Sequence, residues 1–197
     1  DRIKKIQNKI QKHDDPDRFR SYGADVIFGT AKFKNSHTLK IDINAKLKSL
    51  QQYKFKNKKT TTITGKKICI ATGSRPRVPN VPGLKETGFI TNEHIFSLKK
   101  QPKSLAIVGG GVIATELAQA MQRLGTQVTI IEIHDKYLGH FDDDTRKVLT
   151  KKLKSEGVKI LVNATPESAE KNKTKKQLNL KVGAKMQALV VDEILVA

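Results

Sequence analysis

Between residues 104 and 162, runs of consecutive apolar residues alternate with segments whose apolar residues recur every three or four positions. The runs predict three buried strands: one at 104–108, one that leads to Glu132, and one at 158–162. The helical spacing predicts helices at 114–124 and from Asp142 to about residue 155. Because strand and helix alternate, we expect an α/β fold of the Rossmann type with a parallel sheet.

Each of these two helices should bury one face against the sheet. On the first helix the expected inward side chains are Leu117, Ala120, Met121 and Leu124. On the second they are Val148, Leu149 and Leu153. Asp142 is predicted to cap the second helix at its N-terminus, and Gly157 to end it, because these residue types favour those positions.

Outside this region the pattern is weaker. Residues 2–13 carry Ile3, Ile6 and Ile10 at helical spacing, which predicts a helix with one narrow apolar face. Short apolar runs predict strands at 24–28, 30–33, 37–43, 60–64 and 67–71, with a loop at 44–59. Cys69 lies in the last of these strands and is expected to be a buried small side chain. Near the end of the chain we expect a charged loop at 166–176 and a strand pair formed by 177–182 and 186–196.

The proline-rich segment 71–83 suggests where the chain divides. Its three prolines and two glycines predict a rigid, extended crossover rather than a flexible linker. We place the domain boundary after it, where the apolar strand 104–108 opens a new hydrophobic segment. The expected domains are residues 1–101 and residues 102–197, the second of which carries the alternating strands and helices.

The turn between the first buried strand and its helix holds Gly109, Gly110 and Gly111, followed by Val112, Ile113 and Ala114. In such a Gly-x-Gly-x-x-Ala turn, the first glycine permits a tight bend and the second lets the backbone approach a pyrophosphate. The small alanine lets the helix pack closely on the strand. The helix N-terminus presents unpaired N–H groups and the positive end of its dipole to the phosphates.

The second strand ends at an acid that fits the same interpretation. Glu132 lies 21 residues after Gly111, where a carboxylate accepts hydrogen bonds from the ribose hydroxyls of a dinucleotide. Strand, turn, helix, strand and acid in this order predict a dinucleotide site. The alternative is a glycine turn in some other α/β protein.

The composition indicates which classes of partner the chain can bind. The 197 residues carry a formal net charge of +19, which permits binding to nucleic acid or to a membrane surface. Trp is absent and aromatic residues make up only 5%, so no stacking platform accompanies the lysines, and we expect no nucleic-acid partner. No apolar run approaches the roughly 18 residues of a membrane helix, so we expect no membrane partner. The single cysteine, Cys69, favours a reducing cytoplasm.

Two motifs together resemble those of a known family. Residues 70–76 read Ile-Ala-Thr-Gly-Ser-Arg-Pro, and residues 107–116 read Ile-Val-Gly-Gly-Gly-Val-Ile-Ala-Thr-Glu. This pair resembles the flavin-dependent pyridine nucleotide–disulfide oxidoreductases, which include dihydrolipoamide dehydrogenase, glutathione reductase and mercuric reductase. Residues 17–33 and 91–98 are most similar to the mercuric-reductase-like members.

The resemblance implies that residues 1–101 are part of an FAD domain and that residues 102–197 are the NAD domain inserted into it. It implies that Ala71, Thr72 and Gly73 lie along the FAD, although the same residues also suit an ordinary tight turn. It further implies that Glu116 pairs with a lysine near the reactive flavin nitrogen; from the residues alone, Glu116 is equally an exposed first-turn acid favoured by the helix dipole. Val112 stands where several relatives have a tyrosine that gates the nicotinamide pocket, so we expect no such gating here.

Three parts of the family's machinery are missing from this sequence. These are the N-terminal Gly-x-Gly-x-x-Gly that holds the FAD pyrophosphate, the Cys-x(4)-Cys redox pair, and the C-terminal dimer domain with its His…Glu pair. Because the chain starts at Asp1 without a methionine and ends on an apolar strand, we expect it to be an internal piece of a longer protein. We assign no catalytic and no metal-binding residue within it. Surface positions are expected for all five histidines: His13, His37, His94, His134 and His140.

The expected function of the parent protein is hydride transfer from NADH to FAD and onward to a small-molecule disulfide or a metal-ion acceptor. The parent is expected to be a homodimer through its C-terminal domain, and this chain alone is expected to be inactive. Glu132 predicts a preference for NAD(H) over NADP(H), because NADPH-using relatives place arginines where this chain has Ile133 and Gly139. Two alternatives stay open: a flavin NADH dehydrogenase or ferredoxin reductase type of enzyme without a redox disulfide, and a basic nucleotide-binding or interaction module without a redox role.

Overall fold

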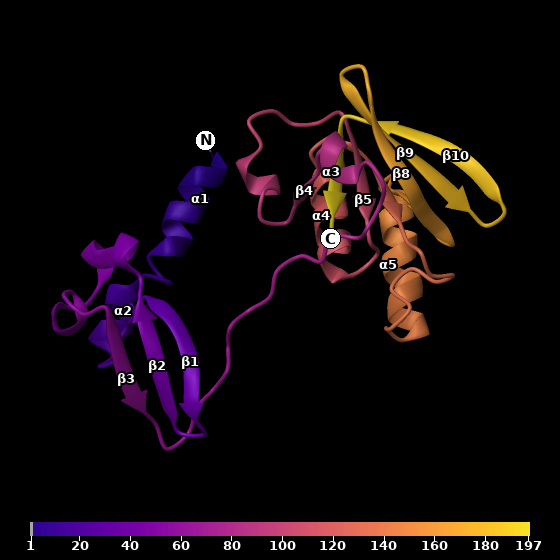
Figure 1. Cartoon of the computed structure of the whole chain (residues 1–197). Helices are drawn as coiled ribbons and strands as arrows, with labels where there is room; N and C mark the ends of the chain where they lie inside the picture. The colour runs from indigo at the N-terminus through magenta and orange to yellow at the C-terminus, as the bar shows by residue number, and fades with distance from the viewer. Residues whose placement is uncertain (1) are drawn as a thin grey trace. The chain divides into compact units, whose positions relative to one another are not determined.

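The computed structural model describes residues 2–197 and divides the chain into two compact units, one that ends at Gly73 and one that spans Ser74–Ala197 (Figure 1). We expected the boundary after residue 101. Residues 74–101 belong instead to the second unit, because their short strand β4 (Ile90–Thr91) pairs in parallel with β11 (Glu193–Val196). The division therefore falls inside the proline-rich crossover.

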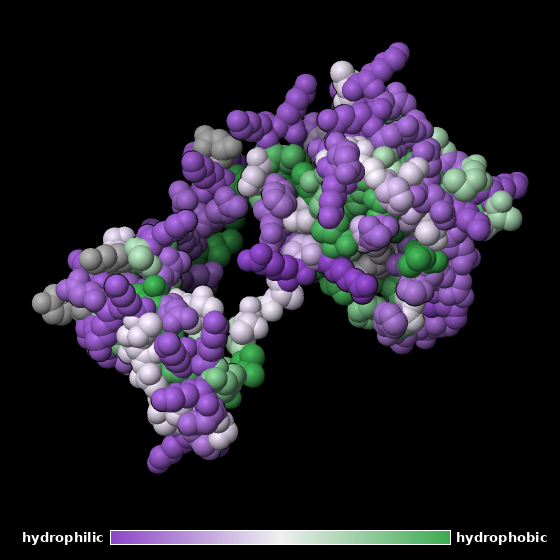
Figure 2. Space-filling model, in the orientation of Figure 1, coloured by the Kyte–Doolittle hydropathy of each residue, from purple (hydrophilic) through white to green (hydrophobic). Residues whose placement is uncertain are grey.

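The first unit contains helices α1 (Arg2–Gln11) and α2 (Pro16–Ser21) and an antiparallel sheet of order β1–β2–β3. The strands are β1 (Gly29–Asn35), β2 (Thr38–Ile43) and β3 (Thr60–Thr64). The expected loop between β2 and β3 holds two short 3-10 helices, η1 (Ala45–Leu50) and η2 (Tyr53–Phe55). All three isoleucines of the predicted face of α1 are about half exposed, and Figure 2 shows hydrophobic residues among mainly hydrophilic ones on the surface of this unit.

Two strand predictions in this unit are wrong, since residues 24–28 and 67–71 are irregular. In the segment 24–28, the side-chain amide of Gln51 accepts a hydrogen bond from the N–H of Phe28 (3.2 Å) and donates one to the carbonyl of Phe28 (2.6 Å). Gln51 thus makes the backbone hydrogen bonds that a neighbouring strand would otherwise make. Residues 67–71 pair with no strand: β3, which precedes them, pairs only with β2 and is the edge of the described sheet. Cys69 is consequently exposed rather than buried, because its segment joins no sheet.

The second unit is built on a parallel sheet of order β4–β11–β5–β6–β7, which confirms the expected α/β fold. The three predicted strands are β5 (Ser104–Val108), β6 (Gln127–Ile131) and β7 (Lys159–Leu161). They are connected by helices α4 (Val112–Arg123) and α5 (Asp143–Ser155), as parallel neighbours require. The short helices α3 (Leu84–Thr87) and η3 (Ile95–Ser97) precede them.

Alternate side chains of the parallel strands enter two different cores. Leu105 and Ile107 of β5 pack on one face with Ala114 and Met121 of α4. Ala106 points to the opposite face, which an antiparallel sheet of order β10–β9–β8 covers (Figure 1). The strands of this second sheet are β8 (Ala164–Asn172), β9 (Lys175–Val182) and β10 (Lys185–Val191). The parallel sheet is therefore a buried middle layer, which explains its continuous apolar runs.

The predicted inward face of α4 is partly wrong. Met121 is buried and Leu117 is half-buried, as expected, but Ala120 and Leu124 are exposed. The helix contacts the sheet through the small residues Ala114 and Ala118, so its buried stripe is rotated away from the larger apolar residues.

Helix α5 begins as predicted, at Asp142. The backbone N–H groups of Thr145 and Asp144 donate to the Asp142 carboxylate (3.0 and 3.1 Å), and these bonds hold the pKa of Asp142 below its usual value. Gly157 follows the last turn with a φ of 93°, in the left-handed region that favours glycine. Both predicted ends of the helix are confirmed.

The inward face of α5 was predicted less well. Leu153 is buried, but Val148 and Leu149 are exposed. The half-buried stripe of the helix runs instead through Arg146 and Thr150 to Leu153. A charged and a polar side chain occupy two of these inward positions, which an apolar pattern cannot reveal.

The expected charged loop at 166–176 is wrong, because it forms most of β8 and the start of β9. The turn between these strands contains Lys173 with a φ of 56°, a conformation that glycine usually supplies, so the usual turn signal was missing. The expected strand 186–196 is in fact two strands. Asp192 separates them, and its carboxylate accepts a hydrogen bond from the N–H of Ser104 (2.8 Å) at the start of β5.

One ion pair connects the two helices' C-terminal ends. Nη2 of Arg123, at the end of α4, lies 2.7 Å from Oε1 of Glu156, which caps α5, and Nζ of Lys152 lies 3.1 Å from the same oxygen. The hydrogen bond from Arg123 is the largest cause that lowers the pKa of Glu156, to about 2.

We expect the free energy of unfolding to depend on this carboxylate at neutral pH and to lose that contribution in acid. Because the folded-state pKa is depressed below the ordinary 4.5, the stabilisation is present above pH 4.5 and is lost as the pH falls towards about 2. Glu156→Gln should therefore be less stable than the unmodified chain at pH 7 in urea unfolding, and the difference should shrink by pH 2. Glu167→Gln, at an exposed position of β8, is the control, and a difference that does not change with pH would contradict the prediction.

Candidate dinucleotide site

The three glycines after β5 differ in what a Cβ would meet at each position. Gly109 has a φ of 113°, and a Cβ there would lie 2.2 Å from the carbonyl oxygen of Ala197. At Gly110 a Cβ would lie 2.4 Å from Oε2 of Glu132 and 3.1 Å from the ring of Tyr137. At Gly111 a Cβ would meet open space, so nothing in this chain itself demands a glycine there.

Gly111 is also the N-cap residue of α4. No side chain of the described residues caps this helix, and the first hydrogen bond within it runs from the N–H of Thr115 to the carbonyl of Gly111 (3.0 Å). The preceding N–H groups of the first turn are therefore available to an anion, at the positive end of the helix dipole.

Glu132 comes directly after β6 and lies beside the glycine turn. It is only 8% exposed, and its Oε1 accepts a hydrogen bond from the N–H of His134 (2.9 Å). The close approach of Oε2 to Gly110 shows that the carboxylate and the turn share one site. The sequence separates the two by about one helix and one strand, and the parallel sheet brings them together at the carboxyl ends of β5 and β6.

The loop after Glu132 contributes residues that sequence reasoning missed. Tyr137 and Leu138 are buried within it, and the hydroxyl groups of Tyr137 and Thr115 are hydrogen-bonded, which ties the loop to the first turn of α4. Burial is the main cause that raises the pKa of Tyr137. The loop has no periodic pattern, so only the apolar character of Tyr137 and Leu138 within a polar segment could have indicated its role.

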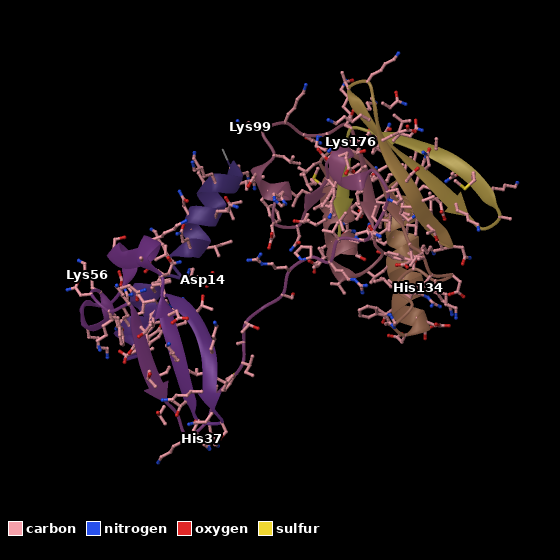
Figure 3. The ribbon with its side chains drawn as sticks, in the orientation of Figure 1. Asp14, His37, Lys56, Lys99, His134 and Lys176 are labelled. Atoms are coloured by element: carbon pink, nitrogen blue, oxygen red, sulfur yellow. The ribbon has the colours of Figure 1, made fainter. Side chains whose placement is uncertain are left out.

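The turn, Glu132 and this loop surround a cavity of about 380 Å³, within the usual size range of small-molecule sites. His134 and His140 stand at it with their ring centroids 6.5 Å apart, and Figure 3 shows His134 on this loop. The lining residues are Gly110, Gly111, Glu132, His134, Asp135, Lys136, Leu138, Gly139, His140 and Phe141.

The other expected site residues lie outside the cavity. Val112 and Ile113 are about half exposed at the start of α4, and Ala114 is fully buried against the sheet. Glu116 is exposed on the same helix. Ala71, Thr72 and Gly73 are exposed at the end of the first unit, where Gly73 has a φ of 68°. The glycine turn and the Ala-Thr-Gly segment thus belong to different compact units.

The sequence also carries predictions for the histidines and the other possible metal ligands. All five histidines are exposed, as expected. Among residues 2–197 we find no group of three or more His, Cys, Asp or Glu side chains that would hold a metal ion. Within the same residues, no helix combines the length and the apolar character needed to cross a membrane.

The buried parallel sheet with its glycine turn defines a protein of the FAD/NAD-binding α/β class. More specifically, the family model for pyridine nucleotide-disulphide oxidoreductases matches residues 2–197, and the chain belongs to that family.

Individual relatives agree with this assignment. A mercuric reductase from Bacillus cereus is 30% identical over 89% of this chain, and a dihydrolipoyl dehydrogenase from Mycoplasma genitalium is 40% identical over 70% of it. Among solved structures, the HOCl-induced flavoprotein disulfide reductase RclA from Escherichia coli matches 88% of the chain with a TM-score of 0.66 and 31% identity. The chain spans 25%, 30% and 35% of these three proteins.

Proposed function

We propose that the Ser74–Ala197 unit binds NADH for a flavin-dependent oxidoreductase, with the nicotinamide dinucleotide held at the glycine turn. The observation that carries this proposal is the pair formed by Gly110 and Glu132, where a Cβ would displace a buried carboxylate. The first turn of α4 would hold the pyrophosphate, and Glu132 the adenosine ribose. When bound, the nicotinamide supplies the hydride, and this chain's residues bind and orient the dinucleotide.

The flavin side of the proposal concerns the Ala-Thr-Gly segment and Glu116. Ala71, Thr72 and Gly73 would lie along the FAD, and Glu116, on α4, would pair with a lysine near the reactive flavin nitrogen. The division into an FAD part and an NAD part belongs to the same proposal. We infer a small-molecule disulfide or a metal ion as the final acceptor, a homodimeric parent and a cytoplasmic location. With one cysteine, Cys69, this chain cannot cycle between dithiol and disulfide by itself, so we expect it to be inactive alone.

We expect the chain to bind NADH about tenfold to a hundredfold more tightly than NADPH. A 2′-phosphate beside the buried carboxylate of Glu132 meets like charge and loses the ribose hydrogen bonds, which costs on the order of 1–3 kcal/mol. Lys136 lines the same cavity and favours the phosphate, but it is exposed, whereas the Glu132 carboxylate is buried, where charge interactions are stronger. Calorimetric titration with both dinucleotides measures the ratio.

The isosteric variant Glu132→Gln tests whether the charge of Glu132 causes the preference for NADH over NADPH. It keeps an acceptor for the N–H of His134 but removes the charge, so the NADH:NADPH ratio should fall towards one. Glu167→Gln, at an exposed carboxylate of the antiparallel sheet, should leave the ratio unchanged. Equal or tighter binding of NADPH by the unmodified chain would overturn the preference, and no binding of either dinucleotide would overturn the proposed function.

A further inference from the structure

A second cavity adjoins the loop that follows Glu132. Its volume is about 580 Å³, and it is formed by one face of α5, the loop residues Asp135 and Lys136, and the strand end at β7. Ile160 and Val162 form a partly buried apolar floor together with the buried Tyr137. It shares only the 135–136 segment with the candidate dinucleotide cavity and contains none of the glycine turn.

The walls of this cavity are strongly cationic. Helix α5 contributes Arg146, Lys147, Lys151 and Lys154, and the loop adds Lys136, against the single carboxylate of Asp135. Lys147, Lys151 and Lys154 follow one another at helical spacing, so their side chains share one face of α5. Figure 2 shows mainly hydrophilic residues in the part of this unit where Figure 1 places α5.

Neighbouring acids neutralise only part of this charge. Arg146 pairs with Asp143 (2.7 Å) and Lys147 with Asp144 (3.6 Å), both on the first turn of the helix. Among the described residues, Lys136, Lys151 and Lys154 have no carboxylate within ion-pair distance, whereas Lys152, on the other side of α5, pairs with Glu156. The unpaired cations of the helix are therefore collected on the cavity side, where they face an apolar floor.

We propose that this cavity is a binding site for a phosphorylated small molecule, distinct from the dinucleotide site. Its oligophosphate group is bound by Lys136, Lys151 and Lys154, and its apolar body lies on Ile160 and Val162. The cavity is open, but its described lining has an apolar floor and no exposed aromatic residue, so it suits a small phosphorylated ligand better than a single-stranded nucleic acid, which binds through exposed aromatic residues. Part of the chain's net charge of +19 then binds the phosphates of this ligand.

The test is calorimetric titration of the full chain with inorganic tripolyphosphate. We expect tripolyphosphate to bind, with an affinity that is about tenfold to a hundredfold weaker in the triple variant K147Q/K151Q/K154Q, because the phosphate-binding Lys151 and Lys154 and the neighbouring Lys147 lose their charges. Glutamine keeps the helix propensity of lysine, so α5 should form normally. The matched control K171Q/K181Q/K185Q removes the same charge from exposed positions of the antiparallel sheet and should bind almost as tightly as the unmodified chain.

Two further variants keep the result interpretable. The milder K151Q/K154Q repeats the measurement if the triple variant unfolds, and should still bind several-fold more weakly. Gly111→Asp, which puts a negative charge at the glycine turn, should leave the tripolyphosphate affinity unchanged whether or not NADH binds there.

Three outcomes would overturn the proposal. Equal weakening in the cavity and control variants would mean that only the diffuse positive field binds the anion. Loss of tripolyphosphate binding in Gly111→Asp would mean that the anion binds at the glycine turn of the dinucleotide site. A single-stranded oligonucleotide that binds more tightly than tripolyphosphate, and is weakened equally by both sets of substitutions, would indicate a nucleic-acid surface instead.

Discussion

Gly111→Asp should reduce the affinity for NADH at least about a hundredfold, which corresponds to about 2.7 kcal/mol, while the chain stays folded. A Cβ at Gly111 meets open space, and the backbone there is extended, so an aspartate fits without strain. Aspartate is also among the preferred N-cap residues, and α4 has no side-chain cap of its own. The new carboxylate would occupy the volume proposed for the pyrophosphate and repel it.

Thermal unfolding and NADH calorimetry on the same protein separate the two effects. The unfolding midpoint of Gly111→Asp should equal or exceed that of the unmodified chain. Gly111→Asn, which caps the helix without the charge, should fold equally well and lose less affinity. If Gly111→Asp binds NADH normally, the phosphates do not lie at this turn and the proposed function fails at its centre.

Gly83→Ala should destabilise the second unit by about 2–5 kcal/mol. Gly83 has a φ of 74°, which costs a residue with a Cβ roughly 1–2 kcal/mol. A Cβ there would also lie 2.1 Å from the carbonyl oxygen of Ala169 in β8, and relieving such a clash costs typically 1–3 kcal/mol. The crossover is held against β8 at this point, since the N–H of Ala169 donates to the carbonyl of Pro82 (2.8 Å).

Gly183→Ala is the matched control for this prediction. Gly183 also has a left-handed backbone, with a φ of 58°, but a Cβ there meets nothing within 4 Å. It should therefore cost only the conformational part, and the difference between the two variants isolates the contact with β8. Urea unfolding followed by amide hydrogen exchange in β5 and β6 measures both, and equal losses would show that the close approach does not contribute.

The local features of the candidate site could be read from the sequence because short-range chemistry determines them. A glycine turn needs Gly109 for its positive φ, and a helix start needs a residue such as Asp142 to accept its free N–H groups. The alternation of buried strands and helices follows from hydrophobic periodicity within single elements. These features were predicted at the correct positions, and so was the α/β class.

The sequence by itself determined the strand–turn–helix unit, the caps of α5 and the acid at the end of β6. Only the tertiary structure decided which elements meet. It inserts β11 between β4 and β5, places residues 74–101 with the second unit, and covers one face of the parallel sheet with β8–β10. It also collects the lysines of α5 around a cavity. These arrangements depend on contacts between residues far apart in the chain, and burial is then shared among several elements, so no local pattern encodes them.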